Sequence, residues 1–212
     1  GTKHPSVTAR RLKNHMPNAK VIMVLRNQRS ALATWYINHG SFLKPAPKKY
    51  WRRFVELDDW LSYCFEFPTI TSVDAMNYEK YYKIFAKEFG ADNLYILLYE
   101  DLLNNKDLYF EKWSDILGIQ SKEISSYLDG KLERTSLTSL EFKLHQLSSI
   151  NITLSKIIAF LLSPLLRTGS SAKIDLPRKW QKKVNDYYSE GNSILNEKFD
   201  LNLEKYDYPL KN

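Results

Sequence analysis

Two short runs of mostly apolar residues constrain the fold of this chain more than any other feature. Residues 19–25 and 93–99 each stand between segments with helical periodicity. Short apolar runs bounded by polar residues are typical of strands buried on both faces. Because helices separate the two runs, we expect them to pair as parallel strands. The sequence therefore predicts an α/β fold with a parallel sheet flanked by helices.

Helical patterns fill most of the remaining chain. We expect helices at residues 6–16, 30–39, 51–63, 74–90, 106–117, 150–166 and 177–199. Gly90 and Gly118 are placed to end two of them, as glycines commonly do. Residues 40–49 predict a loop, and residues 121–143 predict short helices and loops. A chain of 212 residues is expected to form a single domain.

Positive charge is concentrated at the start of the chain. The net charge is +7, and the first 55 residues hold twelve of the 31 lysines and arginines but none of the 24 acidic residues. This segment includes the first predicted strand, so we expect it to fold and to face an anionic ligand. A nucleic-acid-binding protein is one hypothesis. No nucleic acid partner is expected, however, because no such motif is present and the basic residues do not follow one helix face.

Several kinds of site and segment are not expected. The lone Cys64 excludes an intramolecular disulfide, and the four histidines lack metal-ligand spacing, so no metal is expected. The longest apolar stretch, residues 150–166, is interrupted by polar residues and is shorter than the about 20 residues of a membrane span. No signal peptide is visible. We expect a cytoplasmic protein if the source is bacterial, with a membrane anchor upstream of Gly1 as the alternative.

The turn after the first predicted strand has side chains suited to phosphate. Arg26 follows the strand, and Thr34 lies in the first turns of the next helix. Ligands of α/β sheets bind beyond the carboxyl ends of the strands. Helix amides, a guanidinium group and a hydroxyl together suit a phosphate group. On spacing alone, a solvated Arg26 and an ordinary helical Thr34 explain the pattern equally well.

Residues 17–36 resemble the 3′-phosphate-binding motif of sulfotransferases that use 3′-phosphoadenosine 5′-phosphosulfate (PAPS). In that family an arginine ends a strand and a serine follows eight residues later, positions held here by Arg26 and Thr34, with Gln28 in place of the usual proline. Residues 93–118 resemble the family's strand ending in Tyr-Glu-Asp-Leu and its later Phe-Leu-Gly. This resemblance implies that Tyr99 lies against the adenine. Residues 186–209 resemble the last helix of bacterial and carbohydrate sulfotransferases.

The resemblance implies a P-loop-NTPase-like sulfotransferase fold and direct transfer of a sulfuryl group from PAPS to a hydroxyl or amine, with a carbohydrate among the acceptors. It also implies that Arg167 and Lys173 lie on a loop over the 3′-phosphate. His4, which stands 22 residues before Arg26, is the candidate catalytic base, and the alternative is a glutamate from the N-terminal region of the family's fold.

A basic cluster with neighbouring aromatic residues suits a sulfated or acidic glycan. Its members are Lys48, Lys49, Arg52 and Arg53. A solvated basic surface is the alternative interpretation of the same residues.

The family's 5′-phosphosulfate loop has no counterpart in these residues. That loop carries the lysine that stabilises the leaving group. We therefore expect the first βα unit of the fold to precede Gly1, which makes the chain an N-terminally truncated sulfotransferase domain. The alternative is a remnant that binds adenosine 3′,5′-bisphosphate or an anionic glycan without transferring sulfate.

Overall fold

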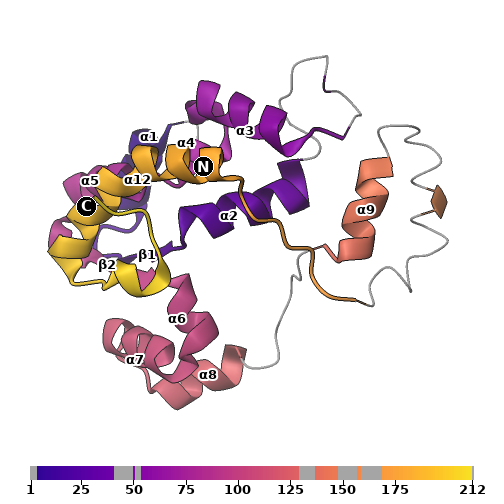
Figure 1. Cartoon of the computed structure of the whole chain (residues 1–212). Helices are drawn as coiled ribbons and strands as arrows, with labels where there is room; N and C mark the ends of the chain where they lie inside the picture. The colour runs from indigo at the N-terminus through magenta and orange to yellow at the C-terminus, as the bar shows by residue number, and fades with distance from the viewer. Residues whose placement is uncertain are drawn as a thin grey trace. The chain divides into compact units, whose positions relative to one another are not determined.

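The structure of the chain is a computed structural model that describes residues 4–40, 50, 54–128, 137–147, 157–158 and 169–211. The chain, drawn in Figure 1, divides into two compact units. The first comprises Gly1–Gln28, Thr69–Leu132 and Gln181–Asn212, and the second Arg29–Pro68 and Glu133–Trp180. The expected single domain stays a prediction.

The two strands lie between helices along the chain, as the sequence predicts. The elements are α1 (Pro5–His15), β1 (Val21–Leu25), α2 (Gln28–Trp35), η1 (Tyr36–Gly40), α3 (Leu57–Glu66), η3 (Pro68–Ile70), α4 (Ser72–Ala75), α5 (Tyr78–Phe89), η4 (Ala91–Asn93), β2 (Leu94–Leu98), α6 (Tyr99–Asn104), α7 (Lys106–Leu117), α8 (Ser121–Leu128), α9 (Ser139–Leu147), α12 (Arg178–Phe199) and η5 (Leu203–Tyr206). Most of the helix expected at residues 150–166 lies outside the described residues.

The sheet of the first unit has two parallel strands among the described residues. β1 and β2 pair in register from Val21 with Leu94 to Leu25 with Leu98. α5 packs on both strands, and α6 and α7 pack on β2. The predicted α/β class, with a parallel sheet flanked by helices, is therefore confirmed.

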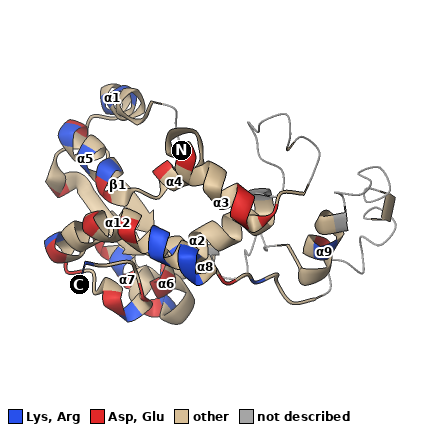
Figure 2. Cartoon of the chain, turned by 45° about the horizontal axis from the view of Figure 1, so that its top comes forward, with Lys and Arg blue, Asp and Glu red and all other residues tan. Residues whose placement is uncertain are grey.

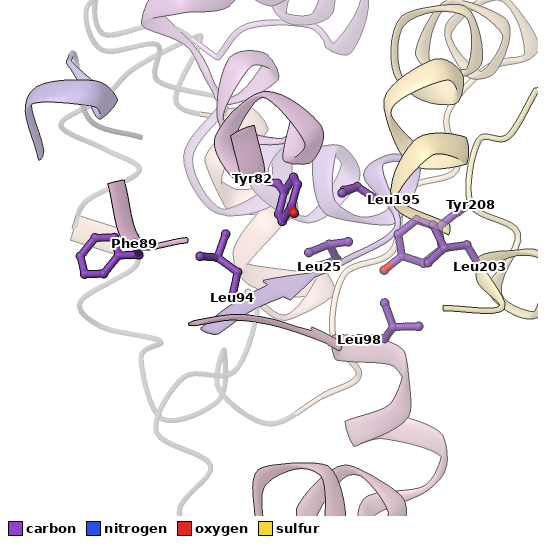
Figure 3. Packing of buried hydrophobic residues seen from close by; sticks show 8 residues of the cluster. All are labelled: Leu25, Tyr82, Phe89, Leu94, Leu98, Leu195, Leu203 and Tyr208. Atoms are coloured by element: carbon purple, nitrogen blue, oxygen red, sulfur yellow. The ribbon is translucent and has the colours of Figure 1, made fainter. Parts of the chain in front are cut away.

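Each face of the sheet carries its own hydrophobic cluster, because successive side chains of a strand point to opposite faces. On one face, α5, α12 and the C-terminal segment join the strands, as Figure 3 shows. The buried members of this cluster are Leu25, Tyr82, Phe89, Leu94, Leu98, Leu195, Leu203 and Tyr208. On the other face, Leu97 packs with side chains of α7 and α8.

The expectation that the first strand is buried on both faces is wrong for Val24. Its side chain is 45% exposed, whereas Leu25 is fully buried. Val24 points to the face whose cluster is centred on Leu97 of β2, and that cluster does not extend over it. The strand is recognisable from its apolar run, but its burial depends on neighbours that the run does not encode.

Asparagine residues cap two helices, and one of these caps divides a segment that periodicity predicts as a single helix. Residues 74–90 form α4 and α5 because the Asn77 side chain accepts a hydrogen bond from the Lys80 amide at 3.3 Å and starts a new helix. Asn105 starts α7 in the same way, accepting from the Leu108 amide at 3.2 Å. The helix expected at residues 51–63 begins instead at Leu57 among the described residues.

The two glycine-terminated helix ends are confirmed. Gly90 and Gly118 follow α5 and α7 with φ angles of 85° and 71°. Side chains disfavour this backbone conformation, and glycine adopts it without strain.

Aromatic side chains pack the second unit around Tyr36. Its ring centroid lies 5.5 Å from that of Trp60, 6.0 Å from that of Phe142 and 6.2 Å from that of Phe54. The Tyr36 hydroxyl donates to the Val55 carbonyl at 2.8 Å. Burial raises the pKa of Tyr36, and the carboxylate of Glu56 raises it further. The hydroxyl therefore stays protonated and keeps this bond over the ordinary pH range.

Candidate functional site

Two predicted site residues follow strand ends that lie side by side. Because Leu25 pairs with Leu98, Arg26 and Tyr99 leave the sheet at the same carboxyl edge. The guanidinium carbon of Arg26 lies 4.7 Å from the centroid of the Tyr99 ring. A guanidinium group over an aromatic face is attracted by the negative face of the ring, and this stacking orients the arginine. The structure thus brings together the arginine and the tyrosine that two separate motifs single out.

Tyr78 holds the backbone of Arg26 from α5. Its hydroxyl donates to the Arg26 carbonyl at 2.8 Å and accepts from the Arg26 amide at 3.2 Å. Burial raises the pKa of Tyr78 to about 12, so this hydroxyl is protonated at neutral pH. Tyr78 belongs to no recognisable motif. Its one sequence signal is its place as the first residue of a helix that packs on both strands.

The two carboxylates that follow Tyr99 are each held by two donors. Glu100 accepts from the Asn27 amide at 2.9 Å and from the Tyr208 hydroxyl at 2.7 Å. Asp101 is 3% exposed and accepts from the Tyr206 hydroxyl and from Lys112, both at 2.7 Å. These four bonds tie the first turn of α6, which follows β2 directly, to three other segments of the first unit.

Gln28, which replaces the proline of the motif, is completely buried. Its side-chain amide donates to the Asn192 side chain at 2.8 Å and accepts from it at 3.0 Å. Asn192 also donates to the Pro209 carbonyl at 2.9 Å. A proline could make neither bond with Asn192, so this departure from the motif has its own partner on α12.

His4 stands at the N-terminus of α1 and is exposed. Its carbonyl accepts from the amide and the hydroxyl of Thr8, at 3.0 and 3.2 Å. These bonds explain how the residue begins the helix. Its role as a base stays a prediction.

The remaining predicted residues belong to the second unit or lie outside the described residues. Thr34 is half-buried on α2, and its hydroxyl donates to the Ser30 carbonyl at 2.9 Å. Lys173 is exposed and follows Ser171, which forms an isolated antiparallel bridge with Thr138. Their roles stay predictions. Five residues lie outside the described residues, namely Lys48, Lys49, Arg52, Arg53 and Arg167.

Charge is distributed unevenly among the helices of the first unit. α1 carries Arg10, Arg11 and Lys13 without an acidic residue, whereas α5 and α7 carry both signs (Figure 2). The described residues include no group of three or more His, Cys, Asp or Glu side chains that could hold a metal ion. No described helix combines the length and apolarity needed to cross a bilayer.

Comparison with known protein families matches residues 4–156 to the sulfotransferase domain. The match covers more than two thirds of the chain and includes both strands with Arg26 and Tyr99 at their ends. No curated protein and no solved structure gave a significant match.

Proposed function

Because the chain belongs to the sulfotransferase domain family, whose common chemistry is sulfuryl transfer, we propose that it transfers a sulfuryl group from PAPS to a hydroxyl or amine, with a carbohydrate as the acceptor. One observation carries the choice of donor. Arg26 is stacked on Tyr99 at the carboxyl edge of the sheet, where ligands of α/β proteins bind. A cation beside an aromatic face suits an adenosine that bears a 3′-phosphate.

In this proposal Arg26 binds the 3′-phosphate and Tyr99 contacts the adenine. Arg26 suits the phosphate because its planar guanidinium group can donate two parallel hydrogen bonds. Its backbone is already held by Tyr78 on both the amide and the carbonyl side, so little reorganisation is needed on binding. Thr34, Arg167 and Lys173 are proposed as further ligands of the nucleotide.

The transfer step needs a base near the acceptor. The acceptor oxygen or nitrogen forms a bond to sulfur while the bond from sulfur to the 5′-phosphate oxygen breaks, and the acceptor proton passes to the base. We assign the base to His4. The cluster Lys48, Lys49, Arg52 and Arg53 is proposed to bind an anionic glycan acceptor through its charge.

Thermal unfolding with adenosine 3′,5′-bisphosphate tests the nucleotide site. A ligand that binds only the folded state raises the unfolding temperature, so the parent chain should be stabilised. Arg26→Ala should weaken binding about 100-fold, the loss expected for a charged bidentate pair. Arg11→Ala is the matched control, since it removes the same charge from an exposed position on α1. An equal loss in both variants, or no stabilisation of the parent, would contradict the proposal.

Transfer itself is measured with sulfur-labelled PAPS and a panel of glycan, alcohol and amine acceptors. Label should move to a glycan acceptor, and His4→Gln should lower the rate without changing nucleotide affinity. Binding of the bisphosphate without transfer to any acceptor would favour the alternative, a nucleotide-binding domain without catalysis.

A further inference from the structure

The C-terminal segment reaches back to the turn that carries Arg26. The side-chain amide of Asn27 donates to the carbonyls of Tyr206 and Asp207, both at 2.8 Å. Asn27 itself is 8% exposed. The turn after β1 is therefore bound to residues about 180 positions further along the chain.

Glu100 makes a second connection between the same two segments. One of its carboxylate oxygens accepts from the backbone amide of Asn27 at 2.9 Å, and the other accepts from the Tyr208 hydroxyl at 2.7 Å. The ring of Tyr208 is 4% exposed and packs in the cluster with Leu25 and Leu98 (Figure 3). Burial raises the pKa of Tyr208, and the charge of Glu100 raises it further, so the hydroxyl donates throughout the neutral range.

Asp207 has an unusual backbone conformation between the residues that bond to Asn27 and Glu100. Asp207 has φ of 53°, in the left-handed region that aspartate tolerates better than most residues. It stands between Tyr206, whose hydroxyl donates to Asp101, and Tyr208, whose hydroxyl donates to Glu100. A residue in a costly backbone conformation persists where its surroundings hold it. The segment around Asp207 contacts the residues that follow both strands, Asn27 after β1 and Glu100 after β2.

We propose that Tyr208 is a positioning residue for nucleotide binding. It acts through Glu100 and the backbone amide of Asn27 to orient Arg26. This inference rests on the proposed function for its ligand. Tyr78 bonds to the Arg26 backbone itself, and Tyr208 reaches the next residue through Glu100, so both residues of the turn are held. A binding group displaced by about 1 Å loses much of its effect. Tyr208 does this without touching the ligand.

The test compares two tyrosine-to-phenylalanine variants. Tyr208→Phe removes the bond to Glu100. Tyr188→Phe is the matched control, because Tyr188 is also buried and its hydroxyl donates to the Val73 carbonyl at 2.8 Å, a residue outside both strand-end turns. Hydrogen exchange of the backbone amide of Asn27 is measured by NMR without ligand. We expect Tyr208→Phe to speed this exchange at least tenfold relative to Tyr188→Phe.

Affinity for adenosine 3′,5′-bisphosphate, measured by calorimetry, gives the second readout. Tyr208→Phe should weaken binding about tenfold, and Tyr188→Phe less than twofold. In the Arg26→Ala background, Tyr208→Phe should cause no further loss, because its effect passes through Arg26. If Tyr208→Phe does not fold, Glu100→Leu tests the same connection, because it removes both acceptor oxygens and leaves the Tyr208 ring in the core.

The outcomes separate this inference from the proposed function. A parent chain that does not bind the bisphosphate contradicts the proposed function, while exchange at Asn27 still decides whether Tyr208 holds the turn. Unchanged protection of the Asn27 amide in Tyr208→Phe would overturn the inference. Equal loss of affinity in the two variants, or a loss that persists without Arg26, would overturn it as well.

Discussion

The two units of the chain bury different kinds of side chain. In the first unit, polar groups are buried at the strand ends and on the elements that contact them, and in the second unit aromatic rings surround Tyr36. The buried polar residues of the first unit are Asn27, Gln28, Ser72, Asp101 and Asn192, whereas Thr138 is the one found in the described part of the second.

Hydrogen bonds and ring packing differ in how strictly they fix the direction of a group. A hydrogen bond holds its donor and acceptor at a defined distance and angle, so a connected polar network specifies how a turn points. Aromatic rings pack in several tilted and edge-to-face arrangements with similar energies. The network holds the turn that carries Arg26, the arginine proposed to bind the nucleotide, whereas ring packing forms the core around Tyr36.

The largest expected effect comes from cutting the network at Asn192. Asn192→Leu keeps the branching and the number of heavy atoms of the side chain but leaves the Gln28 amide and the Pro209 carbonyl without these bonds. Each buried polar group left unpaired costs about 1–3 kcal/mol, so we expect the free energy of unfolding to fall by about 3 kcal/mol. Urea denaturation measures this change.

A double variant sharpens the result. Replacing both partners of a buried hydrogen bond by apolar groups restores much of the stability lost by replacing one. Gln28→Leu combined with Asn192→Leu should therefore be more stable than Asn192→Leu alone. A double variant whose losses simply add would show that the two amides are not coupled, and the polar network would not explain the difference between the units.

The sequence predicts the strands and their parallel pairing because apolar runs and helical periodicity are local patterns. It also predicts that Arg26 lies beyond the carboxyl end of the first strand, whereas the resemblance alone singles out Tyr99, and the structure places the two together. It could not predict that Glu100 would bind Tyr208 or that Gln28 would bind Asn192, because these partners stand 108 and 164 residues apart. No periodicity relates such positions. Gln28 reads as a departure from a motif until its buried partner is known.

Helix boundaries show the same limit on a smaller scale. Residues 74–90 have continuous helical periodicity, yet the chain stops and restarts at Asn77. A single side-chain hydrogen bond to the Lys80 amide decides the boundary. Apolar spacing does not report a bond of this kind, and asparagine is a cap only where the backbone before it is free to leave the helix.

Alkaline pH should lower the stability of the first unit through Tyr78. Burial raises the pKa of Tyr78 from 10.0 to about 12, so its contribution to stability is complete below pH 10 and is lost as pH rises toward 12. Two pKa units correspond to about 3 kcal/mol in all, and about half of this is lost between pH 9 and pH 11. Urea denaturation of the parent at pH 9 and pH 11 should show this loss, and Tyr78→Phe should show a smaller one. Identical losses in the two proteins would assign the pH dependence to other groups.

The smallest expected effect is that of Tyr36→Phe in the aromatic unit. The variant keeps the ring among Phe54, Trp60 and Phe142 and removes one hydrogen bond to the Val55 carbonyl, so unfolding should become easier by about 1 kcal/mol. The same chemical change at Tyr208 should weaken binding of adenosine 3′,5′-bisphosphate about tenfold, whereas Tyr36→Phe should leave it within twofold. Calorimetry on the two variants measures both. If Tyr36→Phe reduces affinity as much as Tyr208→Phe does, a buried hydroxyl aims the site from either unit, and the contrast between polar and aromatic burial no longer explains where the site lies.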